Sequence, residues 1–338
     1  MTQHTITLKP DHATFSALES ETLLNASIKQ GLNLPHSCQN GSCGQCKAEV
    51  ISGTVEQHGC AEHALSAAEA ASGKILLCCS YPQSDLLLNI AGYNGAHMPP
   101  VKTLPVRVHH IHYQQHTAIL TLTLPKRPPF AFLAGQYIDI LLKDGQSRSY
   151  SIANSSKQPT SLELHIRQRE QGLLSNMLFG EQPSIQEKSI LRIRGPLGTF
   201  ILNNPQQQPI ILLATGTGFA PIQSMLHQLI DDAADYPIHL YWGARTAEDL
   251  YAQHTAADLI AQLPNGHFTP VLSRPHHDWQ GAIGYVTHHA LQNHPNLSNH
   301  QVYACGSNDM IRSAQQLCTE HGLLAENFFA DAFLPTHT

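Results

Sequence analysis

Charged side chains are scarce in this 338-residue sequence, because Asp, Glu, Lys and Arg make up only 13% of it, against a usual share of about 25%. The 19 basic residues are outnumbered by 25 acidic ones, and the formal net charge is −6. This balance argues against binding to nucleic acid through a basic surface. Long apolar runs are also missing, and the first residues lack the features of a secretory signal. We therefore expect no nucleic-acid or membrane partner and a cytoplasmic location.

Histidine and cysteine are plentiful instead, with 23 and 8 copies. Six cysteines lie between positions 38 and 79, and the other two are Cys305 and Cys318. In a cytoplasmic chain, such thiols bind metals, act in catalysis or pack in a core more often than they form disulfides. We assign no histidine to a metal, because the pair Cys60 and His63 lacks the second Cys/His pair of a Rieske centre.

Four segments differ in pattern, and a chain of this length is expected to hold two or three domains. Residues 1–92 show strands, short helices and a cysteine loop. Residues 93–102 contain Gly and paired Pro, which predicts a linker. Short strands separated by turn residues over 103–204 predict a small antiparallel barrel. Strands alternating with helices over 205–338 predict a parallel, doubly wound sheet.

Local signals in the first segment allow finer predictions. Ser20 is expected to cap a helix that ends at Gly31. Strand-like residues on both sides of Gly53 predict a short hairpin. Ser66 and Glu69 form the S-x-x-E pattern of a capping box, which predicts a short helix after Ser66.

The cysteine loop carries the most specific signal. Cys38, Cys43 and Cys46 have the spacing C-x4-C-x2-C, and Cys78 follows farther along the chain. This is the plant-type spacing of a 2Fe–2S centre, which needs four thiolates. A structural zinc site would normally use two C-x-x-C or His-containing pairs, and only one such pair is present.

The fourth cluster ligand is open to two assignments, since Cys79 adjoins Cys78. Alternation along a strand would point the two side chains to opposite faces, so that only one could face the cluster. We favour Cys78 because it matches the plant-type spacing. Cys60 lies outside the pattern and is expected to be an ordinary residue.

A glycine-containing turn follows the apolar run at the start of the last segment. Its residues Thr215, Gly216, Thr217 and Gly218 precede a helix, whose first backbone N–H groups suit an anionic diphosphate. Pro221 stands where the Rossmann fingerprint has its third glycine. We expect Pro221 at the first position of the helix, where proline is well tolerated.

With these segments in this order, the chain resembles a known family. Residues 1–92 resemble a plant-type ferredoxin domain, which implies a β-grasp fold. Residues 103–338 resemble a ferredoxin–NADP reductase-type flavoprotein module. The fused arrangement is similar to the reductase components of ring-hydroxylating oxygenases and to CDP-6-deoxy-Δ3,4-glucoseen reductase-like proteins. The expected fold class is therefore a multidomain α+β protein with a β-grasp domain, an antiparallel flavin barrel and an α/β nicotinamide-binding domain.

The resemblance implies a flavin site in the barrel. Arg148, Tyr150 and Ser151 match the family's R-x-Y-S signature, in which a cation, an aromatic face and a hydroxyl near flavin N5 serve the cofactor. Further contacts are implied for His165, Ile166, Arg167, Gly172 and Ser175. The sequence has Gln171-Gly172 where relatives often carry two glycines. By analogy we favour FAD over FMN.

The resemblance also implies a nicotinamide site. Its residues are the turn Thr215 to Gly218, Pro221, Arg245, Ser273, Arg274, Cys305 and Gly306, with Phe333 either covering the flavin or packing. Ser151 and Cys305 are expected nearest the reacting atoms. Arg274 would favour NADPH and Asp249 would favour NADH, and we expect NADH with NADPH as the alternative.

Together these assignments predict an NAD(P)H-dependent electron-transfer reductase. A hydride carries two electrons, a 2Fe–2S cluster accepts one at a time, and flavin connects the two. The expected acceptor is a redox partner protein, either a dehydratase of deoxysugar synthesis or a terminal oxygenase. The alternatives are a flavin or ferric reductase, and a redox sensor that does not turn over.

Overall fold

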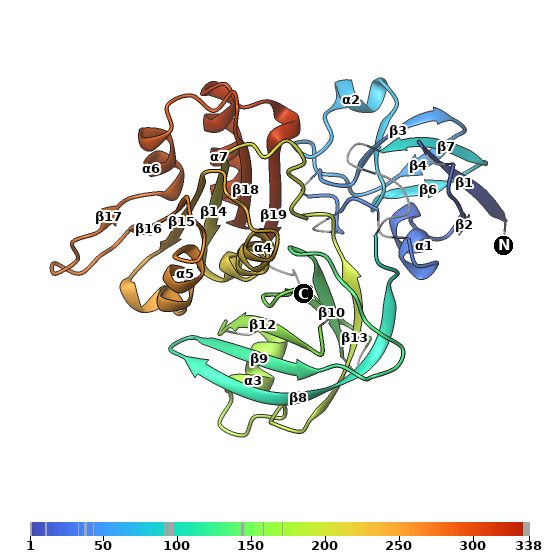
Figure 1. Ribbon diagram of the computed structural model, residues 1–338. Helices are drawn as coiled ribbons and strands as arrows, with labels where there is room; N and C mark the ends of the chain where they lie inside the picture. The colour runs from blue at the N-terminus through green and yellow to red at the C-terminus, as the bar shows by residue number, and fades with distance from the viewer. Residues whose placement is uncertain are drawn as a thin grey trace. The chain divides into compact units, whose positions relative to one another are not determined.

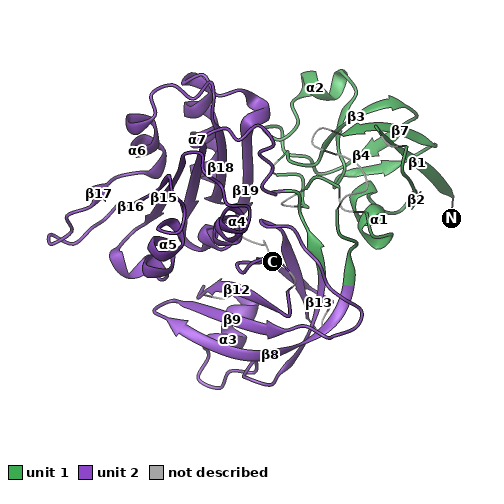
Figure 2. Ribbon diagram, viewed as in Figure 1, with its two compact units in different colours: residues 1–102, 195–199 green, residues 103–194, 200–338 purple. Residues whose placement is uncertain are grey.

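The computed structural model describes residues 2–10, 12–32, 34–36, 39–42, 44–90, 93, 98–142, 145–157, 159–170 and 172–333. The chain forms two compact units (Figure 2). The first unit holds residues 1–102 and 195–199, and the second holds residues 103–194 and 200–338. Within the described ranges, no helix is both long and apolar enough to cross a membrane.

A five-stranded mixed sheet forms the centre of the first unit. Its strands, in spatial order, are β2 (Thr14–Leu18), β1 (Gln3–Lys9), β7 (Leu86–Ile90), β3 (Lys47–Ser52) and β5 (Lys74–Leu76). β1 pairs antiparallel with β2 and parallel with β7. The alternation along β1 buries Ile6 and Leu8 completely, as expected for a sheet with one face on a core.

Two local predictions for this unit are wrong and one is confirmed. Helix α1 (Leu23–Lys29) is capped by Thr22 rather than Ser20, since the Thr22 hydroxyl accepts the amide of Asn25. The strands around Gly53 form no hairpin: β3 pairs with β5 and β7, whereas β4 (Val55–Gln57) pairs with β6 (Ser80–Pro82). The capping box of Ser66 is present at the start of α2 (Ala67–Ala71).

Six strands, which lie almost entirely in the second unit, form a barrel. In spatial order they are β11 (Ser147–Ser151), β10 (Tyr137–Leu141), β13 (Ile190–Leu197), β8 (Lys102–Gln114), β9 (Thr117–Thr123) and β12 (Ser161–Arg167). An antiparallel bridge between Ile152 and Leu164 joins the two outermost strands. The amide of Ala153 also donates to the carbonyl of Glu163 at 2.9 Å. These contacts close the sheet into a barrel.

A parallel sheet follows the barrel in the second unit. Its strands, in spatial order, are β17 (Ala282–Ile283), β16 (Gly266–Leu272), β15 (Ile238–Ala244), β14 (Ile210–Thr215), β18 (Gln301–Ser307) and β19 (Phe328–Phe333). Helices α4 (Phe219–Asp231) and α5 (Gln253–Ile260) pack on one face. Helices α6 (Val286–Asn293) and α7 (Asn308–Glu320) pack on the other (Figure 1). This is the predicted doubly wound arrangement.

Four histidines gather at the amino ends of the parallel strands: His239, His267, His294 and His300. The Nε2 atom of His239 lies 2.8 Å from the Thr269 hydroxyl, and its Nδ1 atom lies 3.1 Å from the Tyr241 hydroxyl. Burial, together with the neighbouring His294 and His267, lowers the pKa of His239 to about 4. These four residues, which we call the histidine cluster, are at the edge opposite the glycine-containing turn.

Candidate functional site

Two of the four predicted cluster ligands can be placed. Cys46 and Cys78 are buried, and their sulfur atoms lie 3.3 Å apart. Cys38 and Cys43 lie outside the described residues. Gly41 in the same loop has a φ of +77°, and a Cβ there would come within 2.6 Å of the Cys79 sulfur. Only glycine permits this close approach of the loop to the thiols, so the described part of the loop fits a compact metal cluster.

The alternation argument for the fourth ligand is wrong in its premise. Cys78 and Cys79 lie in a turn between β5 and β6 rather than on a strand. Both are buried, and their sulfur atoms are 3.6 Å apart. A turn does not force neighbouring side chains to opposite faces, and the short distance between the two sulfur atoms shows that both side chains point in a similar direction. The short separation from Cys46 is the geometric argument for Cys78.

In the barrel, the R-x-Y-S segment lies on strand β11. Arg148 and Tyr150 share one face of the strand and are partly buried, and burial raises the pKa of Tyr150 to about 12. Ser151, at the end of the strand, is 5% exposed. Its Oγ atom has no hydrogen-bond partner among the residues that the structure describes. A buried hydroxyl without a partner is costly, so this atom fits a ligand group such as flavin N5.

The side chains of the three predicted flavin residues on β12 differ in their burial and in their partners. The side chain of Ile166 is 1% exposed and packs in the barrel core. The Arg167 guanidinium binds the Asp249 carboxylate at 2.7 Å. His165 is also buried, and both of its ring nitrogens have protein partners. The imidazole of His165 is therefore not left open to a ligand.

Gly172 and Ser175 belong to a helix that the sequence did not predict. Helix α3 (Leu173–Phe179) starts after Gly172, and the Ser175 hydroxyl accepts the amide of Arg169 at 2.8 Å. A Cβ at Gly172 would come within 3.0 Å of the Ser175 Cβ. Glycine at this position therefore allows the tight start of the helix.

The glycine-containing turn and the end of β18 approach each other closely at Gly218 and Gly306. A Cβ at Gly218 would lie 2.2 Å from the carbonyl oxygen of Cys305, and a Cβ at Gly306 would lie 2.0 Å from the hydroxyl oxygen of Thr215. The Ser307 amide donates to that same hydroxyl at 3.3 Å. The carboxyl ends of β14 and β18 thus form a cradle of backbone, as a dinucleotide site requires.

Pro221 is the third residue of α4 rather than the first, because Gly218 caps the helix and Phe219 begins it. The prediction of the first position is wrong by two residues. A 3₁₀ turn over Gly216–Gly218 precedes the helix and shifts its start. Proline still costs little there, because the first four amides of a helix have no partner within it.

Two arginines lie side by side at the carboxyl edge of β15 and β16. The Arg274 amide donates to the Arg245 carbonyl at 2.9 Å, and both side chains are exposed. The neighbouring Ser273 amide donates to the Ala244 carbonyl. Asp249, on which the expectation of NADH was based, is paired with Arg167 through its Oδ1 atom.

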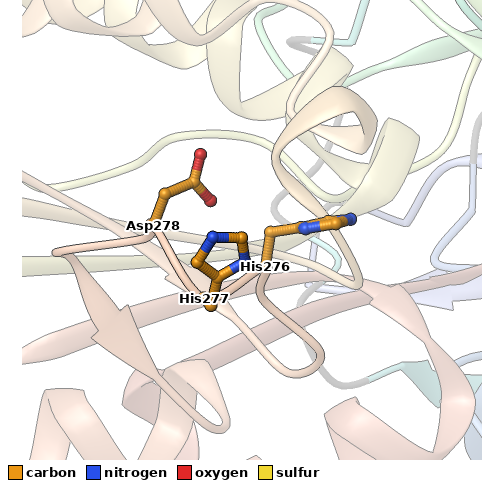
Figure 3. A group of neighbouring side chains, drawn as sticks. All are labelled: His276, His277 and Asp278. Carbon is orange, nitrogen blue, oxygen red and sulfur yellow. The ribbon is translucent and has the colours of Figure 1, made fainter.

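Beyond Arg274, potential ligand atoms of His276, His277 and Asp278 all lie within 4.8 Å of one another (Figure 3). The three residues follow one another in the loop between β16 and β17, and all are exposed. Because all three side chains are exposed, we assign them no metal.

Cys305 and Phe333 complete the predicted set. Cys305 is completely buried in the core of the parallel sheet, and burial raises the pKa of its thiol. Its backbone, rather than its thiol, meets the glycine-containing turn. Phe333 ends β19 opposite Ser307 and packs against the same core.

Three domain families match the chain. The 2Fe-2S iron-sulfur cluster binding domain matches residues 6–83, the oxidoreductase FAD-binding domain matches residues 106–201, and the oxidoreductase NAD-binding domain matches residues 212–316. The predicted fold class and set of cofactor types are therefore confirmed. Together with the fold, these matches define an iron–sulfur flavoprotein oxidoreductase.

Full-length similarity defines the family. The chain is 38% identical over 333 residues to CDP-6-deoxy-L-threo-D-glycero-4-hexulose-3-dehydrase reductase of Yersinia pestis, covering 98% of each chain. It is 29% identical over 337 residues to a terephthalate 1,2-dioxygenase reductase component of Comamonas, covering 99% and 98%. The crystal structure of the Amycolatopsis reductase GcoB matches with a TM-score of 0.84 and 28% identity, over 98% and 99% of the two chains. The chain belongs to the family of ferredoxin-fused NAD(P)H reductases of the ferredoxin–NADP reductase superfamily.

Proposed function

We propose that this protein takes a hydride from NADH and delivers the electrons singly to a partner protein. The observation that carries the proposal is the presence of 2Fe–2S, FAD-binding and NAD-binding domains in one chain. Flavin, when bound, converts between the two-electron donor and the one-electron cluster. The protein's own part is to hold the three groups and to exclude water from the transfer.

The roles that we propose combine the geometry of the described residues with the resemblance to the reductase family. The Ser151 hydroxyl binds near flavin N5, with Tyr150 against the ring and Arg148 at a phosphate. The backbone of Thr215 to Gly218 holds the dinucleotide phosphates at the start of α4, next to Cys305 and Gly306. Cys38, Cys43, Cys46 and Cys78 hold the cluster. No residue acts as a general base, because hydride transfer from NADH to flavin needs none.

We propose a nucleotide-linked deoxyhexulose dehydrase as the electron acceptor. The support is the 38% identity, over nearly the whole chain, with a reductase named for such a dehydrase. An oxygenase component is the second candidate, supported by relatives of 29–30% identity named as components of oxygenases. Each purified acceptor, mixed anaerobically with the protein and excess NADH, would be tested for reduction or product formation.

The donor is proposed to be NADH. The NAD-binding domain supports the choice of nucleotide class, and we propose that the exposed Arg245 and Arg274 distinguish a 2′-phosphate from a hydroxyl. Replacing Arg274 with Ala should raise KM for NADPH much more than KM for NADH. We also propose a cytoplasmic location, where NADH is available and thiols stay reduced.

Anaerobic titration with NADH tests the whole electron path. The flavin absorbance should bleach, and a reduced-cluster EPR signal should appear as it does. Bleaching without that signal would refute the route through the cluster, and an unchanged spectrum would refute the donor. Steady reduction of ferricyanide or cytochrome c would separate an enzyme from a sensor that does not turn over.

A further inference from the structure

Four polar side chains, three of them buried and the fourth, Glu163, partly exposed, form a continuous chain of hydrogen bonds between the barrel and the parallel sheet. The Tyr251 hydroxyl lies 2.7 Å from His165 Nδ1, and His165 Nε2 lies 3.0 Å from Glu163 Oε1. The Gln223 amide donates to that same carboxylate oxygen at 2.8 Å. His165 and Glu163 are on β12 of the barrel, while Gln223 is on α4 and Tyr251 lies between β15 and α5. We call these four residues the barrel–sheet network.

With a neutral His165 ring, the hydrogens of the network can all be placed without conflict. Burial raises the pKa of Tyr251 well above its ordinary value, so its hydroxyl keeps its proton and donates it to His165 Nδ1. His165 then carries its proton on Nε2 and donates to Glu163. The carboxylate of Glu163 accepts from both His165 and Gln223, and hydrogen bonds to these two partners help to lower its pKa. Every polar atom in this path is therefore satisfied.

Both ends of the network lead to the glycine-containing turn. Gln223 is on the second turn of α4, the helix that this turn starts. The Tyr251 ring meets the Trp242 indole edge to face, with centroids 5.3 Å apart, and the indole donates to the Gly216 carbonyl at 3.0 Å. On the same strand as His165, Arg167 also crosses to the sheet and binds Asp249.

We propose that the barrel–sheet network is a positioning device that sets the approach of the nicotinamide to the flavin. The inference rests on the proposed function, in which the barrel holds one reactant and the turn before α4 holds the other. Hydride transfer depends steeply on how the reacting atoms are aligned, and a displacement of about 1 Å can cost about 100-fold in rate. The network fixes β12 to α4 and therefore fixes the two sites to each other.

The test compares two identical chemical changes. Tyr251→Phe removes only the hydroxyl that starts the network. Tyr241→Phe is the matched control, because Tyr241 is a buried tyrosine of the same sheet whose hydroxyl also contacts a histidine ring, His239, at 3.1 Å. Stopped-flow mixing of each holoenzyme with NADH would measure the limiting rate of flavin reduction and the Kd for NADH. The long-wavelength charge-transfer band would report stacking of the nicotinamide on the flavin.

We expect Tyr251→Phe to lower the limiting rate by about 10- to 100-fold, with Kd within about threefold and a weaker charge-transfer band. Tyr241→Phe should keep the rate and the band even if it melts at a lower temperature. Equal rates in both variants would overturn the inference and leave a merely structural role. Failure of the unsubstituted protein to react with NADH would instead refute the proposed function.

A second variant and a second readout keep the test independent of turnover. Gln223→Met breaks the network at its other end and should reproduce the loss of rate, including where Tyr251→Phe does not fold. Hydrogen exchange of the α4 amides should become faster in both network variants and stay unchanged in Tyr241→Phe. Unchanged exchange in the network variants would show that the network does not hold α4 and would overturn the inference.

Discussion

Mild acid should weaken the parallel sheet through its histidine cluster. Burial and the neighbouring His294 and His267 lower the pKa of His239 to about 4, whereas the unfolded chain regains a value of about 6.5. The folded state therefore binds fewer protons than the unfolded state below that value. It follows that the stabilisation is fully present above about pH 6.5 and is lost as the pH falls toward 4.

The size of the effect follows from these two pKa values. A shift from about pH 7.5 to about pH 5.5 lowers the free energy of unfolding by about 1.3 kcal/mol for a fully buried histidine. His239 is partly exposed, and solvent screening reduces this to about 0.7 kcal/mol. Burial also lowers the pKa of His294 and His300, so these two residues add to the loss in the same direction.

Urea unfolding measured by tryptophan fluorescence gives the assay, because Trp242 and Trp279, the only tryptophans of the chain, both pack against the core of the parallel sheet. His239→Gln keeps a polar side chain without a proton to gain, so its stability should fall less between the two pH values. His254→Gln, at an exposed position on α5, is the matched control and should keep the full loss. If His239→Gln and the unsubstituted protein lose stability equally, the reasoning is refuted.

Three further changes test the site. Cys46→Ser should abolish the reduced-cluster EPR signal, whereas NADH should still bleach the flavin. The control Cys318→Ser, in the other unit, should leave both the signal and the bleaching unchanged. Persistence of the EPR signal in Cys46→Ser would contradict the assignment of Cys46 as a cluster ligand. Ser151→Ala removes the buried hydroxyl and should slow flavin reduction about 10-fold, the equivalent of one hydrogen bond, as measured by stopped flow; an unchanged rate would argue against contact with the flavin. Gly218→Ala places a Cβ against the Cys305 carbonyl, so it should destabilise the sheet by about 1–3 kcal/mol. It should also weaken NADH binding in a fluorescence titration. Normal binding would contradict the assignment of the dinucleotide site to the backbone at the ends of β14 and β18.

Patterns that depend on neighbouring residues were predicted well. The alternation of short strands gave the barrel, the alternation of strands and helices gave the parallel sheet, and the S-x-x-E pattern gave the start of α2. These features could be read from the sequence because their causes lie within a few residues of one another.

Features that depend on distant partners were missed. The strands beside Gly53 pair with segments farther along the chain rather than with each other. The barrel–sheet network joins His165 to Tyr251 and Glu163 to Gln223, across 86 and 60 positions. A tyrosine and a glutamine in a helical region carry no local sign of such partners. The two-residue spacing of Glu163 and His165 on one strand was the only available hint.

The bridge between Ile152 and Leu164 gives the barrel a seam, and the buried hydroxyl of Ser151 lies immediately beside that seam. We expect a ligand bound by this hydroxyl to bind the closed barrel more tightly than one opened at the seam. By mass action, its binding free energy then also stabilises closure. A substitution that loosens the seam should therefore weaken binding of such a ligand, even where the substituted residue does not contact it.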